Sequence, residues 1–213
     1  MVTQRAEPGT RARLLEAAER VFAEKGYRGA TVREITRAAG ANVAAVHYHF
    51  GGKKPLYLEL FRERIERLAR VREAALAQAR GRDPVEDLRT VVGHFVRAWI
   101  ERILDEERRD RGRFPLLVMR EVGDPGPAYP LLLERILRPN HEAFRDLILR
   151  ARPELGEEGA LLAAASLMGQ VIHFLRGRRV LEDLLGRAYD GETVDRICDH
   201  VTRFTLRGLG VEP

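Results

Sequence analysis

The sequence predicts an all-α protein of about nine helices, with a small basic N-terminal head and a larger helical body. Apolar residues recur at spacings of three and four in nearly every long segment, and strict alternation over five or more residues is absent. The formal charge of +5 falls in the first quarter of the chain, where ten Lys or Arg face five Asp or Glu. We therefore expect two domains, residues 1–55 and residues 56–213.

Composition narrows the class of protein. A chain of 213 residues with 45% hydrophobic and 32% charged residues is typical of a folded protein with a sizeable core. No run of about 18 uncharged apolar residues occurs, and residues 1–10 lack the apolar stretch of a secretory signal. We therefore expect a cytoplasmic protein with no membrane partner.

Reactive side chains are sparse. The single cysteine, Cys198, cannot form an internal disulfide, so it is either a buried thiol or the site of an intermolecular bridge. Ser166 lies in an apolar segment without a nucleophile turn, and neither a glycine-rich phosphate loop nor a paired-carboxylate site stands out. His94, His141 and His173 show no local spacing of metal ligands. We expect no enzyme, no metal and no cofactor.

The head is expected to begin with two helices. The first covers about residues 10–25 with one apolar face, and Gly26 ends it. The second is short: it begins after Thr31, whose spacing to Glu34 is that of a capping box, and ends at Gly40.

A third helix follows a tight turn that contains glycine. Asn42 is a good N-cap for this helix, which reaches about Tyr48 before Gly51 and Gly52 break it. Two short helices joined by such a turn are typical of a helix-turn-helix unit. The basic charge of the head suits it to neutralise phosphates, although a solvated basic face explains the same charge.

The body is expected to hold longer helices that prolines interrupt. One helix opens near Pro55 and runs to about Arg80, and the next opens at Pro84. The charged run at residues 105–111 fits a solvated loop or a helix end. Five prolines divide residues 114–152, so this segment must form several shorter or kinked helices, and we expect irregular packing and a cavity here.

The last two helices, at about residues 161–175 and 194–206, have broad apolar faces that include small residues. Such a pair can bury itself in the body, or it can meet its copy in a four-helix bundle across a two-fold axis. For the second arrangement, the expected dimer-interface residues are Leu162, Ala165, Met168, Gly169, Ile172, Ile197, Val201 and Phe204.

Residues 31–57 carry the most specific pattern, TVREITRAAGANVAAVHYHFGGKKPLY. The elements of this pattern are Thr31, Glu34-Ile35, Ala39-Gly40, Tyr48-His49-Phe50, Lys53 and Leu56-Tyr57. In this order they resemble the head of the TetR family of bacterial repressors. The resemblance implies a transcriptional repressor that binds a palindromic operator in double-stranded DNA as a homodimer. It also implies a helical ligand-binding and dimerisation domain and release by a small-molecule effector.

The resemblance further implies roles for single residues of the head. Base contacts are expected at Arg33, Val43, Ala44 and His47. Phosphate contacts are expected at Thr31, Ala45, Tyr48, His49 and Lys53. The residue types fit these roles, because small side chains let the backbone approach base edges and a phenol or an ammonium near a helix start is a natural phosphate donor.

Several of these residues have a structural interpretation as well. Arg33 can pair with Glu34 or Glu24, and His49 can be a structural histidine at the end of its helix. Ala45 stands where the family often has a hydroxyl residue, which leaves at most a backbone N–H for phosphate. Core positions are expected at Val46 and Phe50.

The middle of the body resembles the CecR-like branch of the same family, through residues 116–121 and 136–139. This resemblance implies a body that binds a small, partly apolar molecule and dimerises through its last two helices. The pocket candidates are Phe95, Trp99, Met119, His141 and His173. Core packing explains each of these residues too. A helical small-molecule carrier without specific DNA binding is the alternative function.

Overall fold

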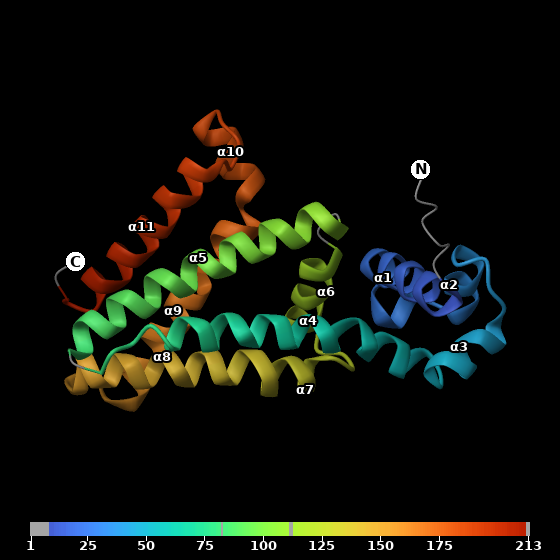
Figure 1. Cartoon of the computed structure of the whole chain (residues 1–213), viewed down its shortest axis with the longest axis horizontal. Coiled ribbons are helices and arrows are strands. Elements are labelled where there is room, and N and C mark those ends of the chain that lie inside the picture. The colour runs from blue at the N-terminus through green and yellow to red at the C-terminus, as the bar shows by residue number, and fades with distance from the viewer. Residues whose placement is uncertain (1–8, 82, 111–112, 212–213) are drawn as a thin grey trace, which may run out of the picture. The chain divides into compact units, whose positions relative to one another are not determined.

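The structure is a computed structural model, and it describes residues 9–81, 83–110 and 113–211 (Figure 1). Every regular element in these ranges is helical, which confirms the predicted all-α class. The chain forms two compact units. The head unit contains residues 1–66 and 106–132, and the body unit contains residues 67–105 and 133–213. This division differs from a cut after residue 55, because a segment from the middle of the chain joins the head unit.

The first three helices of the head unit lie close to their predicted positions. They are α1 (Thr10–Gly29), α2 (Val32–Ala38) and α3 (Val43–Phe50). The predicted end of the first helix at Gly26 is confirmed as a break in its geometry, and a further helical segment follows. Gly26 has a φ of 69°, which breaks the helix geometry locally, and helical turns resume as far as Gly29. Glycine suits this position because a positive φ strains residues that carry a Cβ.

Further helices contribute to the head unit, including the end of α5 (Pro84–Asp110) from Glu106. α4 (Lys53–Leu76) begins there and continues past Glu66 into the body unit, while α6 (Arg113–Gly123) and α7 (Tyr129–Leu132) come from the middle of the chain. Side chains of α1 to α4, α6 and α7 are buried, which makes α6 part of the core of the head unit. The fully or almost fully buried residues include Leu14, Phe22, Ile35, Val46, Tyr57, Phe61, Phe114 and Leu117.

The body unit contains the remaining helices. They are α5 (Pro84–Asp110) as far as Asp105, a π-helix (Leu133–Leu137), α8 (Arg138–Ala151), a 3-10 turn (Pro153–Leu155), α9 (Gly156–Arg176), α10 (Arg178–Leu185) and α11 (Gly191–Gly208). The proline-rich segment is divided into several short elements, as predicted. The short helix α10 was not predicted. α8 lies along α9, and one apolar cluster joins α5, α8, α9 and α11.

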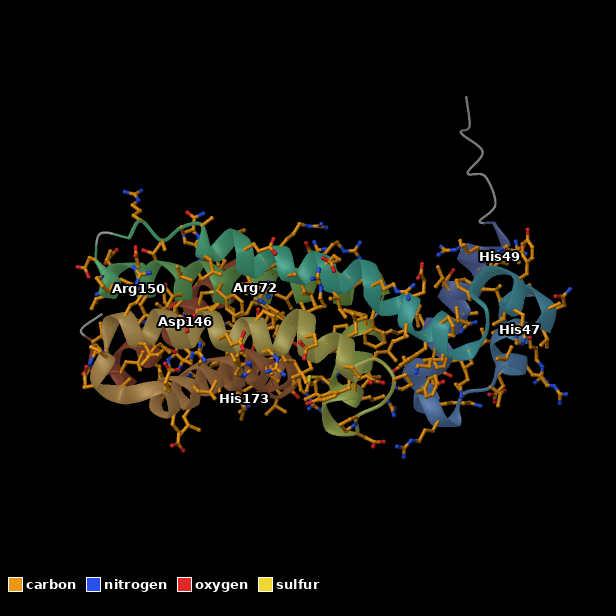
Figure 2. The ribbon with its side chains drawn as sticks, turned by 90° about the horizontal axis from the view of Figure 1, so that it is seen from below. His47, His49, Arg72, Asp146, Arg150 and His173 are labelled. Carbon is orange, nitrogen blue, oxygen red and sulfur yellow. The ribbon has the colours of Figure 1, made fainter. Side chains whose placement is uncertain are left out.

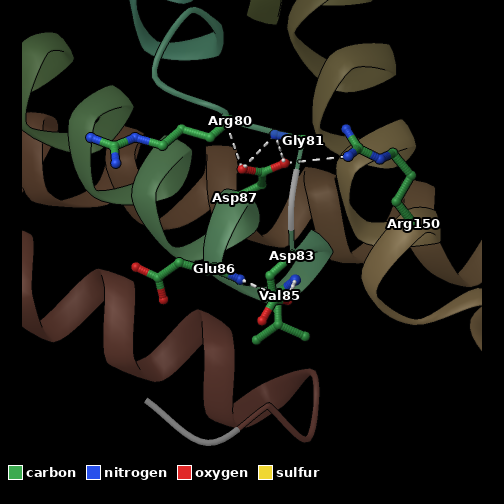
Figure 3. Close-up of polar contacts among 7 residues, drawn as sticks. All are labelled: Arg80, Gly81, Asp83, Val85, Glu86, Asp87 and Arg150. Atoms are coloured by element: carbon green, nitrogen blue, oxygen red, sulfur yellow. Dashed lines mark hydrogen bonds and ion pairs between the residues drawn. The ribbon is translucent and has the colours of Figure 1, made fainter.

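A buried carboxylate, Asp87, holds the connection between α4 and α5 (Figure 3). Its oxygens accept hydrogen bonds from the backbone N–H of Arg80 (2.7 Å) and of Gly81 (2.9 Å). The Arg150 guanidinium of α8 approaches the same carboxylate at 3.3 Å. Next to it, Asp83 caps the start of α5 by accepting from the N–H of Val85 (2.9 Å). These contacts fix the two helices around a loop that glycine shapes.

Helix α9 is apolar but little covered within the body unit. Residues Pro153–Arg176 are long and apolar enough to cross a membrane by length and composition. An 18-residue window within them has a mean hydropathy of 1.3, yet only 28% of that window is buried. The same length and composition fit a helix that a second protein surface covers. The body unit therefore presents apolar surface that its own residues leave exposed.

Candidate nucleic-acid interface

A capping box fixes the start of α2, as predicted. The Glu34 N–H donates to Thr31 Oγ1 (3.2 Å), and the Thr31 N–H donates to Glu34 Oε2 (2.9 Å). Lys25 also forms an ion pair with Glu34. The hydrogen bonds from Lys25 and then from Thr31 lower the pKa of the Glu34 carboxyl to about 2. Because both polar groups of Thr31 serve the cap, its phosphate contact stays a prediction.

Arg33 lies on the exposed side of α2. Its neighbour Glu34 is already engaged by Lys25, so the alternative in which Arg33 neutralises that acid does not describe this structure. Within the described ranges we find no ion pair between Arg33 and any acid. The Arg33 side chain lies at the surface of the head unit.

Helix α3 separates a buried anchor from an exposed face. The Asn42 side chain caps it by accepting from the Ala45 N–H (2.8 Å), and Gly51 ends it with a left-handed φ of 81°. Val46 is fully buried, as predicted, and holds the helix against the head unit. The exposed residues Val43, Ala44, His47 and Tyr48 include all three base-contact candidates of this helix.

The phosphate-contact candidates lie around this exposed face. Tyr48 is 86% exposed, which leaves its hydroxyl open to a partner. The half-buried His49 meets the Tyr48 ring edge-on at 5.0 Å, and Figure 2 places it on a different side of α3 from His47. The Lys53 ammonium lies 4.5 Å from the centre of the Tyr27 ring. Burial lowers the pKa of Lys53, whereas the charge of Glu34 acts in the opposite direction.

Two residues of the motif differ from their predicted environment. Phe50 is only half-buried, because its ring packs under the Arg11 guanidinium (5.2 Å) instead of inside the core. The Ala45 N–H already donates to the Asn42 cap, so a phosphate contact at Ala45 would compete with that cap.

The five pocket candidates are distributed over both units. Met119 belongs to the head unit, where it lines a cleft of about 310 Å³. In the body unit, the ring of Phe95 packs against those of Trp99 (5.7 Å) and Phe144 (4.7 Å). His141 Nδ1 lies 2.6 Å from the backbone oxygen of Leu137, the last residue of the π-helix, and His173 is exposed (Figure 2). The role of these residues in ligand binding stays a prediction.

Trp99 retains an unusual feature. Its indole Nε1 is buried, and no acceptor is found for it among the described residues. Buried N–H groups are normally hydrogen-bonded, so this donor marks a place where a ligand or water oxygen would be stabilised.

The predicted dimer residues divide into two groups. Met168, Ile197 and Val201 are buried in the apolar cluster of the body unit. Leu162 and Phe204 are more than 60% exposed and share the lining of a groove between α9 and α11. The exposed set comprises Leu162, Ala165, Gly169, Ile172 and Phe204.

Two residues of the head unit were not predicted to support the site. Tyr27 supports Lys53, and Glu121 accepts a hydrogen bond from the Tyr57 hydroxyl (2.7 Å). The pairing of residues 57 and 121 joins segments 64 positions apart, so no local spacing signals it.

Comparison with known families divides the chain into two matches. Residues 14–60 match the model of the tetR family of bacterial regulatory proteins, and residues 84–209 match the C-terminal domain of the HTH-type transcriptional dual regulator CecR. The second match alone covers more than half of the chain. The two matches agree with the resemblances predicted for the head and the body.

Individual relatives support the same division. The chain is 28% identical to CecR of Shigella flexneri over 89% of this chain and 86% of that protein. It is 48% identical to the transcriptional repressor AcnR of Corynebacterium glutamicum, over 29% of this chain and only 33% of AcnR. The fold matches that of PfmR, a TetR-family transcriptional regulator from Thermus thermophilus, with a TM-score of 0.58, 22% identity and coverage of 92% and 97% of the two chains.

Proposed function

The chain belongs to the TetR family of transcriptional regulators and has a CecR-type C-terminal domain, and on this premise we propose that it is a homodimeric repressor of a palindromic operator. A small-molecule effector that binds the body unit releases it from DNA. Regulation of transcription and the absence of an enzymatic role follow from the family.

The observation that carries this proposal is the exposed face of α3. A buried valine anchors the helix, while two small side chains, an imidazole and a phenol point away from the core. Small residues allow close approach to base edges, and their methyl groups suit thymine. The exposed Arg33 on α2 adds a donor for guanine or phosphate. Val43, Ala44 and His47 therefore read bases, while Tyr48, His49 and Lys53 hold phosphates.

Dimerisation rests on the uncovered face of α9 and α11. Leu162 (62% exposed) and Phe204 (61% exposed) flank a groove of about 380 Å³ that Ala163 and Gln170 also line. A second copy laid across this face forms a four-helix bundle and removes the apolar area from water. An isologous interface of this kind matches the two-fold symmetry of a palindrome.

The effector binds in the body unit beside Trp99, whose buried indole N–H requires an acceptor. The neighbouring rings of Phe95 and Phe144 favour a partly apolar molecule. The two recognition helices of a dimer must lie about 34–36 Å apart, or a multiple of this spacing, to enter successive major grooves. An effector that stabilises another spacing weakens DNA binding, and DNA weakens effector binding by the same factor.

Selection of genomic DNA with the purified protein tests the proposal. We expect a palindrome, bound as one or more dimers at least about 1,000-fold more tightly than random DNA at the same salt concentration. A confirmed dimer that enriches no sequence would contradict it and favour a small-molecule carrier. Equal effector affinity for free and operator-bound protein would contradict the release mechanism alone.

A further inference from the structure

Residues 106–132 match the C-terminal domain by sequence but pack with the N-terminal head unit. Residues 106–132 lie inside the stretch 84–209 that matches the CecR C-terminal domain. In the structure they belong to the head unit together with residues 1–66. The unit that carries the recognition helix therefore contains chain from the effector domain.

Within this segment, Glu121 is a buried carboxylate (3% exposed) that accepts three hydrogen bonds. The Tyr57 hydroxyl donates to Oε1 at 2.7 Å. The N–H groups of Gly126 and Ala128 both donate to Oε2 at 3.0 Å. The fit is close, because a Cβ on Gly126 would lie 2.6 Å from Oε1. Glu121 thus closes the loop after α6 and ties it to the first turns of α4.

Tyr57 connects this carboxylate with the aromatic core of the head. Only 1% of Tyr57 is exposed, and its ring meets Phe22 edge-on at 4.7 Å and packs against Tyr27 at 4.9 Å. Burial, followed by the hydrogen bond to Glu121, raises the pKa of the Tyr57 phenol far above its usual range. The phenol therefore stays protonated and remains the donor in its bond to Glu121.

Tyr27 in turn supports Lys53. The Lys53 ammonium lies over the Tyr27 ring, which holds the cation without using all of its N–H donors. Nearby, the Arg120 guanidinium of α6 donates to the backbone oxygen of Glu24 in α1 (3.3 Å). Helix α6 thus contacts the head at two adjacent points.

We propose that Glu121 is a positioning residue for DNA binding: by accepting from Tyr57 it fixes the Tyr57–Tyr27 pair on which the Lys53 ammonium rests, and so aims that ammonium at a phosphate. The proposal rests on the proposed function of the head unit. Every contact in the series lies within that unit. Glu121 itself does not touch DNA.

A purely structural role of Glu121 predicts different behaviour. If it only closes the loop at residues 123–128, its removal lowers stability but leaves the DNA affinity of the folded protein unchanged. A positioning role predicts that removal of Glu121 lowers DNA affinity, and that this loss of affinity occurs only when Lys53 is present. A double-mutant cycle separates the two, because residues that act through one another do not show additive effects.

The experiment measures operator affinity of the full-length dimer as a function of salt for Tyr57→Phe, Glu121→Ala, Glu121→Gln and Lys53→Ala. We expect Tyr57→Phe and Glu121→Ala to weaken binding about tenfold, as for one charge-assisted hydrogen bond. The slope of log affinity against log salt should fall by about 1, as it does for Lys53→Ala. Glu121→Gln should bind nearly as wild type, because its oxygen can accept both N–H groups while its amide donates to Tyr57.

The controls keep the proposal open to refutation. Asp87→Ala removes a buried carboxylate from the body unit and should leave the affinity and the salt slope unchanged. Tyr57→Phe combined with Lys53→Ala should bind no more weakly than Lys53→Ala alone. Additive losses, or wild-type binding by folded Tyr57→Phe, would overturn the positioning role while the proposed function stands. A wild-type protein without specific DNA binding would overturn both.

Discussion

Glu121 in the head unit and Asp87 in the body unit are buried carboxylates that hold a loop through two backbone N–H groups. They differ in their third partner. Asp87 meets the guanidinium of Arg150, half of which is exposed, whereas Glu121 meets the buried phenol of Tyr57. Arg150 belongs to the body unit and takes no part in the proposed DNA contacts. Tyr57, in contrast, packs against Tyr27, and the Tyr27 ring contacts Lys53 of the proposed DNA face. Local chemistry alone therefore does not decide whether a buried carboxylate serves stability or binding.

The largest expected effect comes from the apolar face of the body unit. Leu162→Glu together with Phe204→Glu should prevent dimerisation, because charges would be buried without partners. Operator affinity should then fall at least about 100-fold, since the two half-sites are no longer linked. Sedimentation and DNA titration measure both effects. Leu184→Glu, at an exposed leucine of α10, is the matched control and should change neither. A double variant that remains dimeric would place the interface elsewhere.

The next effect concerns Asp87 itself. Asp87→Ala leaves the N–H groups of Arg80 and Gly81 without their acceptor and should lower the free energy of unfolding by about 1–3 kcal/mol. Urea unfolding measures this loss, with Asp146→Ala as a control at an exposed carboxylate. A change in the DNA affinity of the folded variant would contradict the assignment of Asp87 to stability alone.

Two N-caps sharpen the comparison further. Asn42→Ala removes the cap of α3 and should lower stability by about 1 kcal/mol while weakening operator binding severalfold. The Asp190 side chain caps α11 by accepting from the Thr193 N–H (2.8 Å). Asp190→Ala should lower stability without changing the DNA affinity of the dimer, measured at equal dimer concentrations. Equal losses of affinity for both variants would show that cap effects act through global stability.

The smallest effect is a pH dependence in the head unit. The folded pKa of Glu34 is about 2 against 4.5 without its partners, so its contribution to stability is fully present above pH 4.5 and is lost as the pH falls toward 2. Glu34→Gln should remove this part of the acid dependence. Urea midpoints across that window, compared between the two proteins, measure it. Parallel curves would mean that the capping box does not contribute through the charge of Glu34.

Local patterns predicted those parts of the fold that local chemistry determines. Thr31, Asn42 and Gly51 start or end helices through neighbours within four residues, so their spacing is visible in the sequence. Prolines likewise predicted the broken middle segment. Gly26 also breaks the helix at its predicted position, and a short helical segment follows it.

Long-range partners could not be predicted in this way. The bond between Tyr57 and Glu121, and the burial of Ile197 and Val201 in the body core, depend on segments far apart in the sequence. Helical periodicity identifies an apolar face but does not say whether the chain itself or a second copy covers it. The same limit applies to the pocket candidates, of which Phe95 and His173 lie in the body unit and Met119 lies in the head unit.

The most direct test of the account compares His47→Ala with Lys53→Ala on a set of operators that differ at single positions. We predict that His47→Ala relaxes discrimination by about 1–3 kcal/mol at one position in each half-site, because it removes a base contact. Lys53→Ala should weaken binding to all sequences alike and lower the salt slope by about 1. Uniform weakening by His47→Ala, with discrimination intact at every position, would contradict the reading of bases by the exposed face of α3.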